Sequence, residues 1–192
     1  MQHLRHEDYR TVPWKNGGGT TREIALADDP AGFLWRLSMA TVSASGPFSH
    51  FPGIDRTIAC LQGNGMRLSF GDGRVADVLK GGAPLPFPGE ADIHADCIDG
   101  ETIDLNVMTR RDRYQHSVEH VSSAAEFILP PSGGTRAVFF VAPATVVTAE
   151  KTVEVRRFDT MILTGETAPV AVRAEAGLDI FAITLRPLGK SV

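Results

Sequence analysis

The stretch RTIACLQGNGMRLSF, residues 56–70, decides the fold class of this chain. Two runs of mostly apolar residues are joined by Gly63, Asn64 and Gly65. Glycine and asparagine adopt positive backbone φ angles at little steric cost, which makes them typical of tight turns between strands. The stretch therefore predicts two β-strands joined by a turn.

Alternation of apolar and polar side chains predicts further strands on both sides of this stretch. Successive side chains of a strand point to opposite faces of the sheet, so a period of two separates an apolar face from a polar one. At residues 33–42 the two faces hold Trp35, Leu37 and Met39 against Arg36, Ser38 and Ala40. At residues 101–108 they hold Ile103, Leu105 and Val107 against Asp104, Asn106 and Met108.

Short apolar runs continue to the C-terminus between 19 glycines and 12 prolines. No convincing amphipathic helix is present, and the best helical candidate is the short segment at residues 117–127. Many strands without intervening helices indicate an all-β protein of antiparallel jelly rolls. We expect a first barrel at 13–111, a connector at 112–134 and a second, smaller barrel at 135–192. This division leaves the N-terminal strand available to pair with the second barrel.

Composition excludes several classes of protein. The 23 acidic and 19 basic residues give a net charge of -4 and are scattered, so no basic stripe is available to bind nucleic acid. No apolar run approaches the roughly 20 residues needed to cross a bilayer, and MQHLRHEDYR at the N-terminus lacks the apolar core of a secretory signal. Cys60 and Cys97 form no C-x-x-C pair. A cytoplasmic protein with no membrane partner is expected.

The segment PWKNGGGTTREI, residues 13–24, resembles a phosphate-binding loop only at first sight. A Walker loop needs its lysine after the last glycine, whereas Lys15 precedes the three glycines here. A dinucleotide fingerprint needs a third glycine where Arg22 stands. The glycines instead predict a turn at which another part of the backbone passes closely.

Metal and nucleophile chemistry find little support in the sequence. The segment GPFSHFPGIDRTIACLQG, residues 46–63, has the outline of the first metal motif of the cupin superfamily, but only His50 is present, and Arg56 stands about where the ligating glutamate would be. Because a guanidinium cannot ligate a cation, no metal is expected at this site. No other cofactor is expected either. There is no G-x-S-x-G nucleophile motif. Acid-base chemistry by Asp55, Asp104, Glu23 or His50 stays open.

Three blocks of sequence resemble the HutD/Ves family of bacterial cupin-like proteins: PWKNGGGTTREI, WRLSMATVSASGPFSHFPGIDRTI and DLNVMTRR. Together they cover most of residues 13–111. The resemblance implies a two-barrel cupin (bicupin) fold and a gene often placed among histidine-utilisation genes. It implies no established enzymatic activity and a proposed role in binding a pathway metabolite.

Several arginines in these blocks suit a small carboxylate ligand, because a guanidinium grips a carboxylate with two parallel hydrogen bonds. The histidine-breakdown intermediates urocanate and N-formylglutamate are such ligands. The candidate ligand-binding residues are Trp14, Lys15, Asn16, Arg22, Arg36, Ser38, His50, Phe51, Asp55, Arg56, Asn106 and Arg110, with Phe48 as a further apolar wall.

The orientation of Arg36 depends on which face of its strand points into the barrel. If Trp35, Leu37 and Met39 fill the barrel, Arg36 faces water. If they pack between the sheets or on a partner, Arg36 points into the mouth of the barrel. The second orientation is favoured because a binding barrel has a partly polar interior. Asp55 and Arg110 are also candidates for a structural ion pair.

A non-enzymatic binding protein that moderates histidine utilisation is the leading hypothesis. The alternatives are a metal-independent isomerase or epimerase that uses His50 with Asp55, and a structural or interaction subunit. The oligomeric state stays open, with a homodimer favoured by the exposed strand edges of such barrels.

Overall fold

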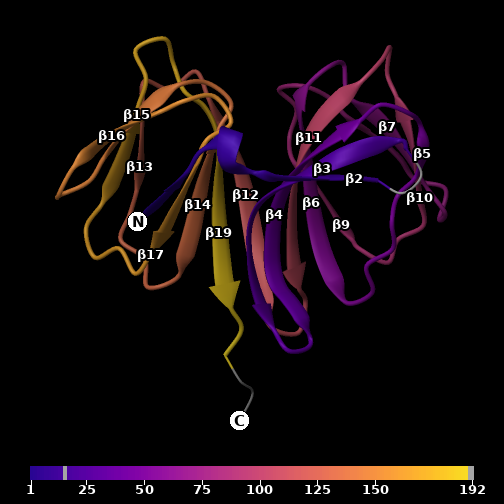
Figure 1. Ribbon diagram of the computed structural model, residues 1–192, viewed down its shortest axis with the longest axis horizontal. Coiled ribbons are helices and arrows are strands. Elements are labelled where there is room, and N and C mark those ends of the chain that lie inside the picture. The colour runs from indigo at the N-terminus through magenta and orange to yellow at the C-terminus, as the bar shows by residue number, and fades with distance from the viewer. Residues whose placement is uncertain (15–16, 190–192) are drawn as a thin grey trace. The chain divides into compact units, whose positions relative to one another are not determined.

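The protein is built almost entirely of β-strands (Figure 1). The computed structural model describes residues 1–14 and 17–189, and within these ranges it contains nineteen strands and one short 3₁₀ helix, η1 (His6–Asp8). The strands pair in antiparallel fashion. Two compact units result. The N-terminal unit comprises Arg10–Gln115 with residues 188–189, and the C-terminal unit comprises Met1–Tyr9 with His116–Pro187.

The N-terminal unit consists of two antiparallel sheets. The six-stranded sheet has the order β2-β3-β4-β11-β6-β9 and the four-stranded sheet the order β5-β10-β7-β8. The strands are β2 (Arg10–Pro13), β3 (Gly19–Asp29), β4 (Gly32–Val42), β5 (Gly46–Pro47), β6 (Ile54–Gln62), β7 (Met66–Phe70), β8 (Val75–Val78), β9 (Leu85–Pro88), β10 (Ile93–Cys97) and β11 (Thr102–Arg110).

The predicted strands β6 and β7 form as expected, and their turn has positive φ angles of 87° at Gly63 and 101° at Gly65. A Cβ at Gly63 would lie 2.3 Å from the carbonyl oxygen of Glu101, so only glycine fits this close approach. The two strands do not pair with each other, because β6 belongs to the six-stranded sheet and β7 to the four-stranded one. The turn therefore carries the chain from one sheet to the other.

Apolar side chains from both sheets form the core of the N-terminal unit. The six-stranded sheet contributes inward-facing residues such as Val42 and Ile58, and the four-stranded sheet contributes residues such as Leu68, Phe70 and Ile93. These side chains lie on one face of each strand, as the period of two requires. The core occupies one part of the space between the sheets, and the polar positions of the same faces lie beyond it.

The C-terminal unit also consists of two antiparallel sheets. Their orders are β1-β17-β14-β19-β12 and β13-β18-β15-β16. Residues 2–4 form β1, which pairs with β17. The strands are β1 (Gln2–Leu4), β12 (Tyr114–Ser122), β13 (Glu126–Leu129), β14 (Thr135–Phe140), β15 (Ala144–Val147), β16 (Thr152–Val155), β17 (Thr160–Thr164), β18 (Val170–Arg173) and β19 (Asp179–Pro187).

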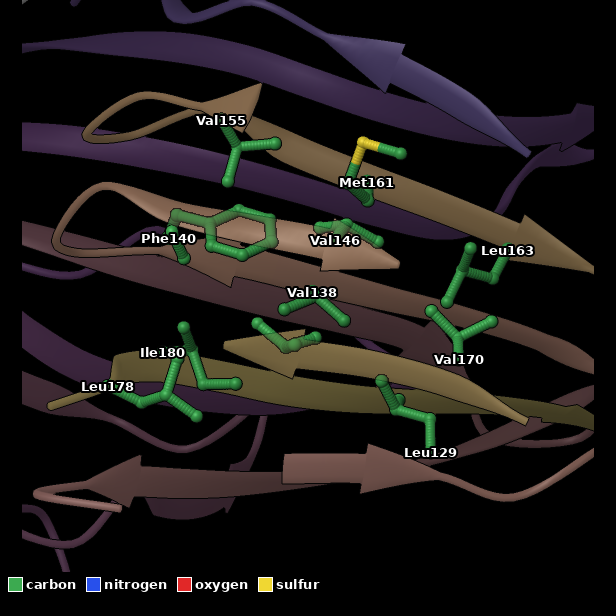
Figure 2. Close-up of a cluster of buried hydrophobic side chains, with 12 residues drawn as sticks. Leu129, Val138, Phe140, Val146, Val155, Met161, Leu163, Val170, Leu178 and Ile180 are labelled. Atoms are coloured by element: carbon green, nitrogen blue, oxygen red, sulfur yellow. The ribbon is translucent and has the colours of Figure 1, made fainter. Parts of the chain in front are cut away.

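The core of the C-terminal unit is a tightly packed apolar cluster between its two sheets. Figure 2 shows its side chains pointing toward one another from neighbouring strands. Phe140 and Val172 are fully buried in it, from β14 and β18 respectively. The twelve buried members are Leu129, Val138, Phe140, Ala144, Val146, Val155, Met161, Leu163, Val170, Val172, Leu178 and Ile180.

The helix proposed for residues 117–127 does not form. This segment belongs to β12 and β13, and the predicted connector at 112–134 contains both strands. Side chains of β12 alternate between more and less buried positions, and the strand adjoins β19 in the five-stranded sheet. Its backbone hydrogen bonds are therefore supplied by the sheet, which outweighs the weak helical propensity of the segment.

Within the described part of the chain, no helix has the length and apolar character required to cross a membrane.

Candidate functional site

A cavity of about 500 Å³ opens between the sheets of the N-terminal unit. Its described lining comes mainly from the six-stranded sheet and from the segment that leads to β6. The lining residues are Pro13, Trp14, Thr21, Arg36, Ser38, Ala40, Val42, Pro47, Phe48, Ser49, Phe51, Arg56, Asp104, Asn106 and Met108.

Strand register aligns the arginines of the cavity. Met108 on β11 lies opposite Arg36 on β4 and opposite Arg56 on β6. Because neighbouring strands are about 4.8 Å apart, the two arginines start roughly 10 Å from each other, on either side of Met108. We call these three residues the arginine row.

Two further rows on the same face contain the other polar groups of the cavity. Asn106 lies opposite Ser38 on β4, and Asp104 lies opposite Ala40 on β4 and Cys60 on β6. Positions two residues apart on a strand share a face, which places Asp104 and Asn106 on the same wall as Met108. The cavity wall therefore runs from two arginines through an amide to a carboxylate.

Arg56 lies in an aromatic cage. Its guanidinium carbon is 5.3, 5.4 and 4.9 Å from the ring centres of Phe48, Phe51 and Phe87, and the residue is 6% exposed. Burial lowers the pKa of Arg56 to about 10, which still leaves it charged at neutral pH. Its Nη1 donates to the carbonyl oxygen of Ser49 at 3.4 Å, while its Nε has no protein partner. A buried cation with an unused donor favours an anionic ligand.

Asp104 is an acidic group at the opposite end of this wall. It is 2% exposed, and its Oδ1 has no hydrogen-bond partner in the protein. Burial raises the pKa of Asp104 to about 7, against an opposing influence from the charge of Arg56. The Oδ1 of Asn106, in the neighbouring row, is also buried without a partner. These oxygens are able to accept hydrogen bonds from a bound molecule.

Arg36 lines the cavity, in the orientation favoured from the sequence. Its Nε donates to Glu23 Oε2 at 3.2 Å, and both side chains are about a quarter exposed. Trp35, Leu37 and Met39 are buried on the opposite face of β4. Glu23 thus offsets part of the charge of Arg36 and fixes its position.

The glycine segment forms one edge of the cavity. Trp14 donates from Nε1 to Thr21 Oγ1 at 2.8 Å, and both residues line the cavity. A Cβ at Gly19 would lie 2.2 Å from the carbonyl oxygen of Thr41 and 3.1 Å from the Trp14 ring. This is the close backbone approach predicted for the glycines. Lys15 and Asn16, two of the candidate ligand contacts, lie outside the described residues.

Six of the candidate residues line the cavity together: Trp14, Arg36, Ser38, Phe51, Arg56 and Asn106. Phe48, the expected further wall, lines it as well.

Four other candidates do not belong to this lining. His50 is exposed, with its Nε2 3.9 Å from Asp92 Oδ1. Arg22 lies on β3 next to Thr21, so its side chain starts on the other face of the strand.

Asp55 and Arg110 do not pair with each other, and both have other ionic partners. Asp55 Oδ1 accepts a hydrogen bond from Arg111 Nε at 2.6 Å, and Arg110 Nη1 donates to Asp29 Oδ1 at 3.0 Å. Strand register and loop position determine whether Arg110 or Arg111 pairs with Asp55, and the sequence alone does not reveal which one does.

Several lining residues were absent from the candidate ligand-binding residues, although Asp104 was considered for acid-base chemistry: Pro13, Thr21, Ala40, Val42, Pro47, Ser49, Asp104 and Met108. Asp104 is the most consequential of them. The alternation of residues 101–108 had already placed it on the same face as Asn106, and this was the signal that could have identified it.

The described residues contain no group of three or more histidine, cysteine, aspartate or glutamate side chains that could hold a metal ion. Arg56 stands about where the cupin metal motif has its ligating glutamate, and its side chain lines the cavity.

Sequence comparison relates the chain to two groups of bacterial proteins. It is 35% identical over 159 residues to an uncharacterised 21.2 kDa protein in the hutC 3′ region of Pseudomonas putida, which covers 82% of each chain. It is also 38% identical over 120 residues to the protein Ves of Citrobacter koseri, covering 60% of this chain and 62% of Ves.

Structural comparison supports the same relationship. HutD from Pseudomonas fluorescens SBW25 superposes with a TM-score of 0.85 at 30% identity, over 98% of this chain and 99% of the other. The oxalate decarboxylase of Lactobacillus farciminis, in its formate complex, shares the fold with a TM-score of 0.66 at 12% identity, over 98% of this chain and 87% of the other.

These neighbours identify the fold as an all-β, cupin-like arrangement of antiparallel sheets. The HutD family model matches residues 6–181, which is most of the chain. The chain therefore belongs to the HutD family, the family to which the three sequence blocks pointed.

Proposed function

We propose that the chain binds a small carboxylate metabolite in the cavity of the N-terminal unit, without catalysing a reaction, and thereby moderates histidine utilisation. The observation that carries the proposal is the buried, caged guanidinium of Arg56 in the cavity wall. Membership of the HutD family and the relative in the hutC 3′ region support the metabolic context.

The chemistry of Arg56 favours a carboxylate. A guanidinium that is removed from water retains most of its charge but loses solvent hydrogen bonds, so an anion that restores them binds strongly. The Phe48, Phe51 and Phe87 rings hold the guanidinium plane in one place, which limits the entropy lost when a ligand binds. Arg36, at the other end of the arginine row, adds a second positive charge.

The cavity also has a suitable size and apolar surface. Its volume of about 500 Å³ lies within the range of roughly 300–1,000 Å³ that is typical of small-molecule sites. Trp14, Phe48 and Phe51 provide flat apolar walls. Urocanate and N-formylglutamate, the carboxylates expected from the family resemblance, are the ligands that we propose to test.

The two alternative functions have less support. His50 and Asp55, the acid-base couple of the isomerase hypothesis, do not line the cavity among its described residues, and Asp55 is engaged by Arg111. The hypothesis of a purely structural subunit requires a barrel filled by large apolar side chains. The cavity instead contains space next to Arg56 and Asp104.

The proposal is tested by calorimetric titration of the protein with urocanate and with N-formylglutamate. We expect binding of at least one of them, and at a hundredfold excess over its Kd it should stabilise the fold by about 2.7 kcal/mol. Arg56→Met should weaken this binding by at least about tenfold, because the hydrogen bond between the guanidinium and the ligand carboxylate is lost. Arg67→Met, which removes an exposed arginine that pairs with Asp77 on the four-stranded sheet, is the matched control.

Three results would contradict the proposal. Absence of heat and of thermal stabilisation with both acids would remove the carboxylate ligand. NMR of the mixture over hours would detect any conversion of a bound acid, and such conversion would show that the protein is an enzyme. Equal binding by Arg56→Met and the parent protein would move the ligand away from this cavity.

We also propose that the two units correspond to the two barrels of a bicupin. Each unit has two antiparallel sheets that enclose an apolar core, which supports this correspondence. Expression of residues 10–115 alone should give a folded protein if the N-terminal unit is a self-sufficient barrel, and circular dichroism with cooperative unfolding would test this.

A further inference from the structure

Asp104 is the feature of the cavity that carboxylate binding leaves unexplained. Among the described lining residues it is the one carboxylate. It is 2% exposed, and its Oδ1 has no hydrogen-bond partner in the protein. Leaving a buried polar atom unpaired is unfavourable, so such an atom in a ligand cavity points to a group that the ligand supplies.

An ionised carboxylate accepts hydrogen bonds and cannot donate them. The carboxylate of a ligand therefore cannot satisfy the ionised form of Asp104 and would repel it. Asn106, in the neighbouring row, is different because its amide carries both an acceptor and donors and can present either one. Of these two residues, only Asp104 in its ionised form requires the ligand to supply a hydrogen-bond donor.

The position of Asp104 shows which end of the ligand meets it. Asp104 is four residues from Met108 on β11, so its row lies roughly 13 Å along the strand from the arginine row. The arginine and aspartate side chains shorten the gap that a ligand has to span. A ligand whose carboxylate binds at Arg56 therefore extends its opposite end toward Asp104.

We propose that Asp104 is the specificity-determining residue of the cavity, and that it accepts a hydrogen bond from an N–H group at the end of the ligand opposite its carboxylate. The inference rests on the proposed function and narrows it. The site selects carboxylates with a distal hydrogen-bond donor, such as an azole N–H, over carboxylates of the same shape without one.

The electrostatic surroundings of Asp104 fit this role. Burial raises the pKa of Asp104 to about 7, whereas the charge of Arg56 on β6 favours the ionised form. An N–H donated by the ligand would favour the ionised form further. The Cys60 thiol on β6 and the Cys97 thiol on β10 also lie within electrostatic reach of Asp104. Burial raises the pKa of both thiols, so both are neutral and do not compete for a ligand donor.

The test compares two ligands of nearly identical shape by calorimetry. Urocanate carries an imidazole on its acrylate, and cinnamate carries a phenyl ring in the same place, without the N–H. We expect the parent protein to bind urocanate roughly tenfold to a hundredfold more tightly than cinnamate, because a hydrogen bond to a charged acceptor is gained. Asp104→Asn, a change of nearly equal shape, replaces the charged acceptor by a neutral one and should lower this preference by about tenfold.

Asp77→Asn on β8 is the matched control, since Asp77 is paired with Arg67 on the four-stranded sheet and does not line the cavity. It should keep the preference of the parent protein.

Each outcome decides the inference. Equal affinity of the parent protein for the two acids would overturn the role of Asp104 and leave carboxylate binding intact. Binding of neither acid would overturn the inference, and titration with N-formylglutamate would then decide whether the proposed function stands. A preference that stays unchanged in Asp104→Asn would assign the N–H recognition to another residue. If that variant fails to fold, the two affinities of the parent protein still decide whether an N–H is recognised. Asp104→Leu, which has no hydrogen-bond acceptor and should lose the preference, provides the second variant.

Discussion

The interiors of the two units differ although their sheets are arranged alike. In the C-terminal unit, twelve buried apolar side chains fill the space between the sheets. In the N-terminal unit, the apolar cluster fills only part of the space between the sheets. Beyond it, the inward positions of β4, β6 and β11 hold Arg36, Arg56, Asp104 and Asn106 around a cavity. Charged and polar side chains at a few inward positions thus accompany a cavity in one unit, where the other unit has a filled core.

The two buried arginines of the described chain sharpen this contrast. Arg136 in the C-terminal unit donates from Nη1 to the carbonyl oxygen of Pro130, and its Nε and Nη2 have no protein partner. It does not line the cavity of the N-terminal unit, and among the described residues no aromatic ring stacks on its guanidinium. Arg56, by comparison, is held by three rings beside open space, and this setting makes its charge available to a ligand.

The largest expected effect tests the packed interior. Phe140→Ala should lower the free energy of unfolding by about 3–5 kcal/mol, because it removes a fully buried ring and leaves a void. Phe48→Ala at the edge of the cavity should cost less, since Phe48 is only partly buried. Chemical denaturation measures both, and an equal loss for the two variants would contradict the contrast between filled and hollow interiors.

The pH dependence of stability tests the charged interior. The pKa of Asp104 is raised to about 7 in the folded protein, above its ordinary value of 3.8, so the folded state holds a proton that the unfolded state has released between these values. The free energy of unfolding should therefore decrease as the pH rises from about 4 to about 7, by a few kcal/mol. Asp104→Asn should flatten this part of the curve.

Urea denaturation at several pH values between 4 and 8 provides the measurement. The expected result concerns the difference between the slopes of the parent protein and the variant, because other groups titrate equally in both. Parallel curves would show that Asp104 has an ordinary pKa in the folded protein.

A glycine at the edge of the cavity has a smaller expected effect. Gly19→Ala should lower the free energy of unfolding by about 1–3 kcal/mol, since its Cβ would overlap the Thr41 carbonyl and press on the Trp14 ring. Displacement of Trp14 should also weaken ligand binding. Gly46→Ala in β5 is the control, because a Cβ there meets no atom within 4 Å. Unchanged stability of Gly19→Ala would refute the close approach.

The smallest effect is expected outside the cavity. Asp55→Ala removes a half-exposed ion pair with Arg111, and such pairs contribute about 0–1 kcal/mol. Ligand affinity should stay unchanged, because Asp55 does not line the cavity. A large loss of affinity, measured by calorimetry, would return Asp55 to the site and restore part of the acid-base hypothesis.

Much of the cavity could be predicted from strand alternation. Arg36 with Ser38, and Asn106 with Asp104, share faces because positions two apart on a strand always do. Of the described candidates outside the lining, Arg22 lies on the other face of β3, and the others lie in a loop or near a strand end. His50 and Asp55 belong to the same sequence block as Phe51 and Arg56, and only the latter two line the cavity.

The sequence by itself determined the strand content, the turns at the glycines and the family, because these depend on local periodicity, on backbone angles and on motifs contiguous in the chain. Only the tertiary structure decided that β6 and β7 enter different sheets, that most of 117–127 is strand, and that Arg111 is the partner of Asp55. It also decided that Asp104 is buried beside an unfilled space. Such features depend on register and packing between segments far apart in the sequence, which set the neighbours and the exposure of each side chain.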